Sequence, residues 1–181
     1  MGNCYAYACK RDVVNAQYIP GSYAGSKVEP AAREQKLDKK GQPVPPKKKE
    51  VQAYTDALVE GVIADMEGNN ISTGAARISR KIKVMPQIPA NHYVIALVAK
   101  IDGFHFCRRD DDGLWSWKMG PSGVFTDKCF DIRRKAYVQS DIDDALMKKI
   151  LQNGKVFPQF GPPWLFGAYF VLPDDGMNVA A

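Results

Sequence analysis

Apolar residues recur at helical spacing in one long stretch of the chain. Between residues 51 and 66 they fall three or four positions apart, and Gly68 with the two asparagines after it supplies a stop signal. The opposite face of this stretch is polar and carries Gln52, Asp56, Glu60 and either Asp65 or Glu67. The pattern predicts an amphipathic helix that packs on a core and carries no evident chemistry.

A second pattern begins after Pro89. Residues 93–99 form a nearly continuous apolar run, which is typical of a strand buried on both faces. Turn signals separate it from further predicted strands at 104–109, 114–118, 124–125 and 164–172. Residues 110–112 are all aspartates and resemble a metal cluster, but an Asp-rich run followed by Gly113 favours a hairpin turn. This part of the chain therefore predicts an antiparallel sheet.

Three shorter segments complete the predicted elements. A short helix is expected from Cys4 to residue 10 or 11, and another begins at Ser140 and closes at Asn153 and Gly154. Residues 71–85 fit either a helix or an edge strand, and Pro86 ends the segment in both cases. With the helices segregated from the strands, the predicted fold class is α+β.

The segment between residues 21 and 50 differs in composition from everything around it. It is rich in Gly, Pro and Lys, and the prolines at 43, 45 and 46 exclude a helix interior or a central strand. We expect a flexible surface excursion at about 21–50 within a single domain that spans residues 1–181.

Charge and composition restrict the classes of partner. The chain has 181 residues, of which 45% are hydrophobic and 25% charged, and a formal net charge of +5. Many of the lysines fall between residues 33 and 49, where no aromatic side chain is available to stack on a base. A solvated loop is favoured there over a nucleic-acid site. No apolar run is long enough for a bilayer, so no membrane partner is expected, and the oligomeric state stays open.

The cysteines indicate a reducing compartment. Four are present, none in a C-x-x-C pair, and the N-terminus lacks the apolar stretch of a secretory signal. Position 6 is alanine, where the myristoylation pattern asks for serine or threonine. We expect four reduced thiols, no metal or other cofactor, and a protein that is cytoplasmic or delivered by a signal-independent secretion route.

Cys4 is the first candidate for chemistry. Asn3 before it is a preferred helix N-cap, so Cys4 would lie in the first turn, where free backbone N–H groups and the helix dipole stabilise a thiolate. The alternative is a cysteine that only packs, because free cysteine is among the most buried residue types. A thiol nucleophile also needs a base, and the chain has two histidines, His92 and His105, both in the predicted sheet.

The motifs C-Y-A-Y-A at Cys4, H-Y-V-I-A-L-V at His92 and F-H-F at His105 resemble those of the papain-like thiol hydrolases, including the NlpC-like cell-wall peptidases. The resemblance implies a nucleophile helix packed on an antiparallel sheet, with Cys4 as the nucleophile. In one assignment His92 is the base and His105 the polar third member. In a second assignment, suggested by the F-H-F-C-R-R-D and G-L-W-S-W-K motifs of small bacterial and phage-type proteins, His105 is the base and Asp127 orients it.

The sequence departs from that family at the oxyanion hole. No glutamine precedes Cys4, so the resemblance leaves the Cys4 backbone N–H and a donor such as Asn3 or Gln17 to form the hole. Trp117 also stands where a histidine is expected.

The leading prediction is a cysteine hydrolase that cleaves an amide bond of a peptide or protein through an acyl-thioester on Cys4. The alternatives are a non-catalytic papain-like interaction module, a glutamine deamidase acting on a partner protein, and a nucleic-acid binder that uses the lysine-rich segment.

Overall fold

The computed structural model describes residues 4–11, 18–28, 38–40, 44, 47–82, 84–101, 103–111, 113, 115–118, 124–126 and 165–180, with residues 124–126 described by their backbone alone. In this part of the chain the helices come first: α1 (Cys4–Ala8), α2 (Lys48–Gly68) and α3 (Gly74–Ile82). The strands follow: β1 (His92–Lys100), β2 (Gly103–Arg109), β3 (Trp115–Lys118), β4 (Val124–Thr126) and β5 (Leu165–Pro173). The predicted α+β class is confirmed.

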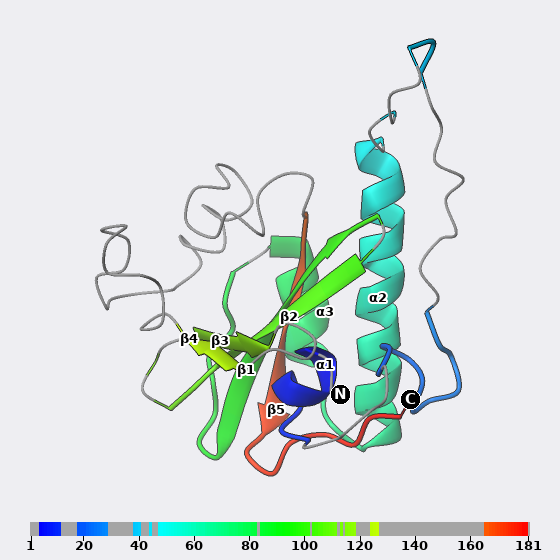
Figure 1. Ribbon diagram of the computed structural model, residues 1–181. Coiled ribbons are helices and arrows are strands. Elements are labelled where there is room, and N and C mark those ends of the chain that lie inside the picture. Colours follow the sequence, from blue (N-terminus) through cyan, green and yellow to red (C-terminus); the bar gives the residue numbers. More distant parts are fainter. Residues whose placement is uncertain are drawn as a thin grey trace, which may run out of the picture.

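The strands form one antiparallel sheet in the order β4-β3-β2-β1-β5 (Figure 1). β1 lies between β2 and β5, with Leu97 opposite Phe106 and Ile95 opposite Phe170. β3 pairs with residues 107–109 of β2, and β4 pairs with β3. The chain thus runs from β1 to β4 by successive neighbours, and β5 returns to the other side of β1.

Both faces of β1 are buried. Its odd-numbered residues join one core cluster with Phe106, Phe170 and buried side chains of α1 and α2. Its even-numbered residues face the other way, and Val94, Ala96 and Val98 are also buried. This burial explains why the sequence of β1 is a continuous apolar run instead of an alternating one.

The predicted long helix is confirmed as α2, which begins at Lys48, three residues before the predicted start. The Glu50 carboxylate accepts a hydrogen bond of 2.9 Å from the backbone N–H of Lys47, so it satisfies a donor at the helix start. Of the two alternatives for the end of the polar face, Glu67 is exposed, whereas Asp65 is fully buried. Figure 1 shows α2 standing along one side of the sheet, with the two ends of the chain near its lower end.

The two short helices differ from their predictions. α1 ends at Ala8, before the predicted end, and Lys10 then adopts a left-handed φ of 54° that cannot continue a helix. The ambiguous segment 71–85 contains a helix, α3. The Ser79 hydroxyl of α3 donates to Tyr169 O at 2.9 Å and accepts from Tyr169 N at 3.0 Å. α3 therefore covers the outer edge of β5 and satisfies backbone groups that an exposed edge strand would leave unpaired.

The beginning of the predicted flexible excursion is held in place. Residues 18–28 are described, and the chain at Pro20 passes so close to α2 that a Cβ on Gly61 would lie 2.9 Å from Pro20 O. Gly61 permits this approach because it has no side chain. The loop is fixed further by the buried Asp65 carboxylate, which accepts hydrogen bonds from the backbone N–H groups of Gly21 and Ala24. Residues 29–37 lie outside the described part.

The last strand is confirmed as β5, and it ends at Pro173, one residue beyond the predicted end. Its pairing with β1 shifts register between Ala96 and Val98, next to Gly167. A Cβ on Gly167 would lie 3.0 Å from Leu97 Cδ2, so glycine allows the close contact at this irregularity. The helix predicted at residues 140–153 lies outside the described residues. Among the helices that are described, none has both the length and the apolar character needed to cross a bilayer.

Candidate functional site

Cys4 is the first residue of α1, as predicted, but its thiol is packed against backbone. Only 6% of the residue is exposed, and it belongs to the main core cluster. The thiol donates a weak hydrogen bond to Phe104 O, with Sγ 3.9 Å from that oxygen. Phe104 belongs to β2 and lies before the residues of that strand that pair with β3. Cys4 therefore contacts β2 itself.

The surroundings of Cys4 favour the protonated thiol. Burial raises the pKa of Cys4 to about 12, and hydrogen bonds from nearby backbone groups, that of Phe106 first among them, lower it by less. α1 has five residues, so its dipole is short. The thiolate predicted from the helix start is consequently not stabilised at neutral pH.

The His105 imidazole does not face α1. Its strand neighbour Phe106 points toward α1 and packs on Tyr5, with ring centroids 4.8 Å apart. Because side chains alternate along a strand, His105 points to the opposite face of the sheet. It is 5% exposed, and burial alone lowers its pKa to about 3. Cys4 and His105 therefore lie on opposite sides of the sheet, and the structure does not assemble the expected thiol–imidazole pair.

His92 lies at the far end of β1 from Cys4. Phe104, which contacts Cys4, is opposite Ala99, while His92 is opposite Pro173. The seven residue-to-residue steps from position 92 to position 99 span roughly 23 Å in an extended strand. His92 is exposed, and its Nδ1 lies 2.9 Å from Ala90 O. The prediction that His92 is the base for Cys4 is therefore corrected.

The remaining predicted site residues are not placed. Asn3, Gln17 and Asp127 lie outside the described residues. The aspartate run is a turn, as predicted: Gly113 N donates to Asp110 O at 2.8 Å, and the Asp110 carboxylate pairs with Arg108. Within the described residues no group of three or more His, Cys, Asp or Glu side chains could hold a metal ion.

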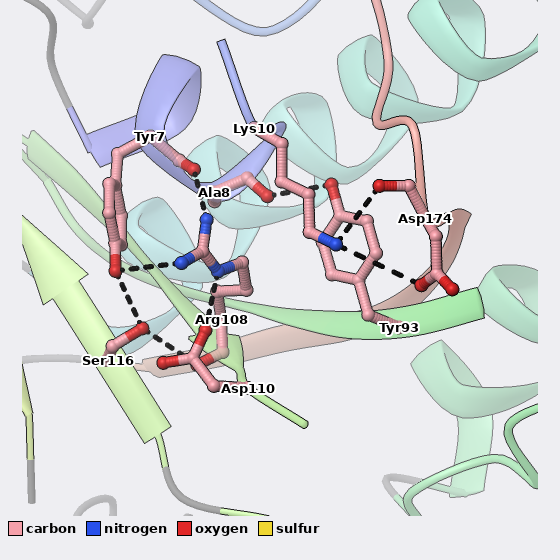
Figure 2. Close-up of polar contacts among 8 residues, drawn as sticks. All are labelled: Tyr7, Ala8, Lys10, Tyr93, Arg108, Asp110, Ser116 and Asp174. Atoms are coloured by element: carbon pink, nitrogen blue, oxygen red, sulfur yellow. Dashed lines mark hydrogen bonds and ion pairs between the residues drawn. The ribbon is translucent and has the colours of Figure 1, made fainter. Parts of the chain in front are cut away.

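The same motifs do meet elsewhere, in a polar cluster on the α1 side of β2 and β3 (Figure 2). Tyr7, Arg108 and Ser116 come from the C-Y-A-Y-A, R-R-D and W-S-W motifs. The Tyr7 hydroxyl donates to Ser116 Oγ at 2.8 Å and accepts from Arg108 Nη2 at 3.1 Å. The Arg108 guanidinium also lies 4.4 Å above the Tyr7 ring and binds Asp110 at 2.7 Å. Burial raises the pKa of Tyr7, so its hydroxyl stays protonated as a donor.

Two clusters hold the C-terminal end of α1: the one just described and a second one formed by Lys10, Tyr93 and Asp174. Arg108 Nη1 donates to Tyr7 O at 3.3 Å, and the Tyr93 hydroxyl donates to Ala8 O at 3.0 Å. Lys10 lies 4.4 Å above the Tyr93 ring and pairs with Asp174 (Figure 2). These donors satisfy carbonyls that the end of a helix leaves free, and the two cations suit the negative end of its dipole. The two clusters therefore hold α1 on the sheet, which matters because a helix of this length is not stable alone.

Asp65 fixes the opposite side of α1. Its carboxylate accepts hydrogen bonds from the Tyr5 hydroxyl at 2.8 Å, from Gly21 N at 2.8 Å and from Ala24 N at 3.0 Å. Burial raises the pKa of Asp65, and these hydrogen bonds oppose the rise. The residue joins α1, α2 and the 18–28 loop. Its position at i+3 from Val62 and next to Met66 was the available signal that it lies near the buried stripe.

Comparison of the chain with protein-family models, with curated proteins and with solved structures gave no match.

Proposed function

We propose that the chain is a binding module for a protein or peptide partner and does not act through a Cys4 thiolate. One observation argues against a Cys4 nucleophile and so favours the non-catalytic module over the hydrolase: Cys4 is buried against the backbone of β2, with its pKa raised to about 12. A cysteine nucleophile works as the thiolate and needs a base in hydrogen-bond reach. Of the two histidines, one points to the other face of the sheet and the other lies at the far end of β1.

The polar cluster of Tyr7, Arg108 and Ser116 supports the same proposal. Its hydrogen bonds run between α1 and the sheet and leave Ser116 fully buried. A side chain whose hydrogen bonds join a helix to a sheet does not need to contact a substrate. The motifs that resemble those of thiol hydrolases then act by holding α1 on the sheet.

The second candidate is the papain-like cysteine hydrolase that cleaves an amide bond through Cys4. The order of elements favours it, since Cys4 begins a helix that packs on an antiparallel sheet through the strand that carries His105. A papain-like fold and an NlpC-like or deamidase activity belong to this candidate.

Labelling of Cys4 by iodoacetamide separates the two functions. At pH 7.5 the thiolate fraction of a group with a pKa of about 12 is on the order of a thousandfold below that of the ordinary thiol with a pKa of 9.0. We therefore expect Cys4 in the native protein to react at least a hundredfold more slowly than glutathione, measured by peptide mapping with mass spectrometry.

The control is the same protein in urea, where Cys4 should react at the rate of glutathione. The hydrolase would be supported instead if native Cys4 reacted faster than glutathione and if His105→Ala removed that excess rate. Cys4→Ala identifies the labelled peptide, because the other cysteines remain in that variant.

A further inference from the structure

α3 turns apolar side chains toward water. Ile78 and Ile82 are 60% and 59% exposed, while the small residues Ala76 and Ser79 make the buried contacts. Ser79 has to face β5 because it hydrogen-bonds to the backbone of Tyr169. That contact directs the isoleucines, one turn apart, to the outside of the molecule. Two adjacent exposed isoleucines form an apolar ridge, and Val84, 44% exposed, follows the helix.

A charged pocket adjoins this helix. Asp56 of α2 and the α3 residues Arg77, Arg80 and Lys81 line a space of about 350 Å³. Three cations and one carboxylate therefore line the pocket, and two further carboxylates lie beside it. Arg80 pairs with Asp56 and with Glu60, and Arg77 pairs with Glu67 at 2.9 Å. Within the described part of the chain Lys81 has no such ion pair, and it is exposed on the row next to the isoleucines.

The charges around the pocket distinguish a protein segment from a membrane. Asp56, Glu60 and Glu67 stand beside the cations and offset most of their charge. A surface of this kind has little net positive potential, which adsorption on an anionic bilayer requires. A single carboxylate, by contrast, is small enough to enter the pocket and reach Lys81. A segment that also carries aliphatic side chains can cover Ile78 and Ile82, which lie one turn apart on the exposed face of α3.

We propose that the exposed face of α3, with the pocket between α3 and α2, is the docking surface for a partner protein segment that carries a carboxylate beside aliphatic side chains. This proposal deepens the proposed binding function and rests on it. The carboxylate pairs with Lys81 and the exposed edge of Arg77, and the aliphatic side chains bury Ile78 and Ile82. The expected recognition is therefore mixed, with apolar contacts for affinity and one ion pair for register.

Selection from a phage-displayed library of random dodecapeptides tests this surface on the full chain. Selected peptides are expected to combine an acidic residue with aliphatic residues, and their affinity is measured by fluorescence anisotropy. Ile82→Ser and Lys81→Glu are each expected to raise Kd about tenfold. Exchanging the acidic residue of the peptide for lysine should restore binding to Lys81→Glu and weaken binding to the unaltered protein.

Matched variants outside the surface control for general effects of the substitutions. Val44→Ser and Lys40→Glu change exposed residues of the same types in the 38–44 region and should leave Kd unchanged. All of these variants should keep the thermal midpoint of the unaltered protein, because the substituted side chains are exposed.

Three results overturn the proposal: selection of no peptide that depends on α3, equal loss of affinity in the control variants, or binding to phosphatidylserine vesicles that Ile82→Ser and Lys81→Glu remove. The last result would assign the surface to a membrane. Failure here is distinct from failure of the binding function as such, because Cys4 labelling involves no residue of α3.

Discussion

α1 and α3 are both short helices that lie against β-strands. The apolar side chains of α1 are packed in the core, whereas two large apolar side chains of α3 face solvent. α1 buries Cys4, Tyr5, Ala6 and Ala8, and polar groups of the sheet fasten its end. α3 buries Ala76 and Ser79 and exposes two isoleucines and two cations. The helix with the reactive residue type is thus part of the core, and the helix without any catalytic motif exposes apolar and charged side chains.

The chemistry of a residue depends on what its helix or strand packs against. A cysteine at a helix start is reactive when its helix faces a cleft, and inert when the thiol contacts strand backbone in a core. An isoleucine pair is core in most helices. In α3 the hydrogen bonds of Ser79 to β5 set the rotation of the helix, so the pair faces outward.

Removal of the Asp65 carboxylate should have the largest effect on the α1 side. Asp65→Ala leaves the Tyr5 hydroxyl and the backbone N–H groups of Gly21 and Ala24 without their acceptor. We expect a loss of about 3 kcal/mol in the free energy of unfolding, measured by urea denaturation. Asp56→Ala, at a half-exposed ion pair of the same helix, should cost less than about 1 kcal/mol. Equal losses in the two variants would contradict the role given to Asp65.

Protonation of His105 should have the next largest effect. Burial holds the pKa of His105 at about 3 in the folded chain, against 6.5 for the ordinary group. The unfolded chain therefore binds more protons, and stability is complete above pH 6.5 and falls as the pH falls toward 3. Between pH 7 and pH 5 the expected loss is about 2 kcal/mol.

His105→Gln isolates this contribution, because Asp65 and the other carboxylates titrate alike in both proteins. The difference between the two unfolding profiles should grow by about 2 kcal/mol across that interval. A difference independent of pH would mean that His105 is not buried as the neutral imidazole, and would reopen its assignment as a base for Cys4.

Loss of the guanidinium fork at Arg108 should have the smallest effect of the three. Arg108→Lys keeps the charge but cannot bind Tyr7 O, the Tyr7 hydroxyl and Asp110 together. We expect a loss of about 1 to 2 kcal/mol in the free energy of unfolding. Arg77→Lys in α3, whose ion pair is half exposed, should change it by less than about 0.5 kcal/mol. A larger effect in α3 than in α1 would reverse the comparison between the two helices.

The sequence alone determined the fold class and most of the described elements. Periodicity located α2 because its buried apolar residues recur three or four positions apart. The apolar run of β1 and the turn at Asp110 were visible for equally local reasons, since burial on both faces and Asp-Gly turn chemistry leave direct marks in the residue order. The start of α1 at Cys4 was likewise predicted correctly.

Only the tertiary structure decided how the candidate residues lie relative to one another. Alternation along β2 separates His105 from the face that α1 covers, and the length of β1 separates His92 from Cys4. The hydrogen-bond partners of Asp65 and the exposure of Ile78 and Ile82 follow from how α2 and α3 pack against the rest of the fold. Local sequence does not encode these relations, because a pKa, a base within reach or an exposed face depends on neighbours that are distant along the chain.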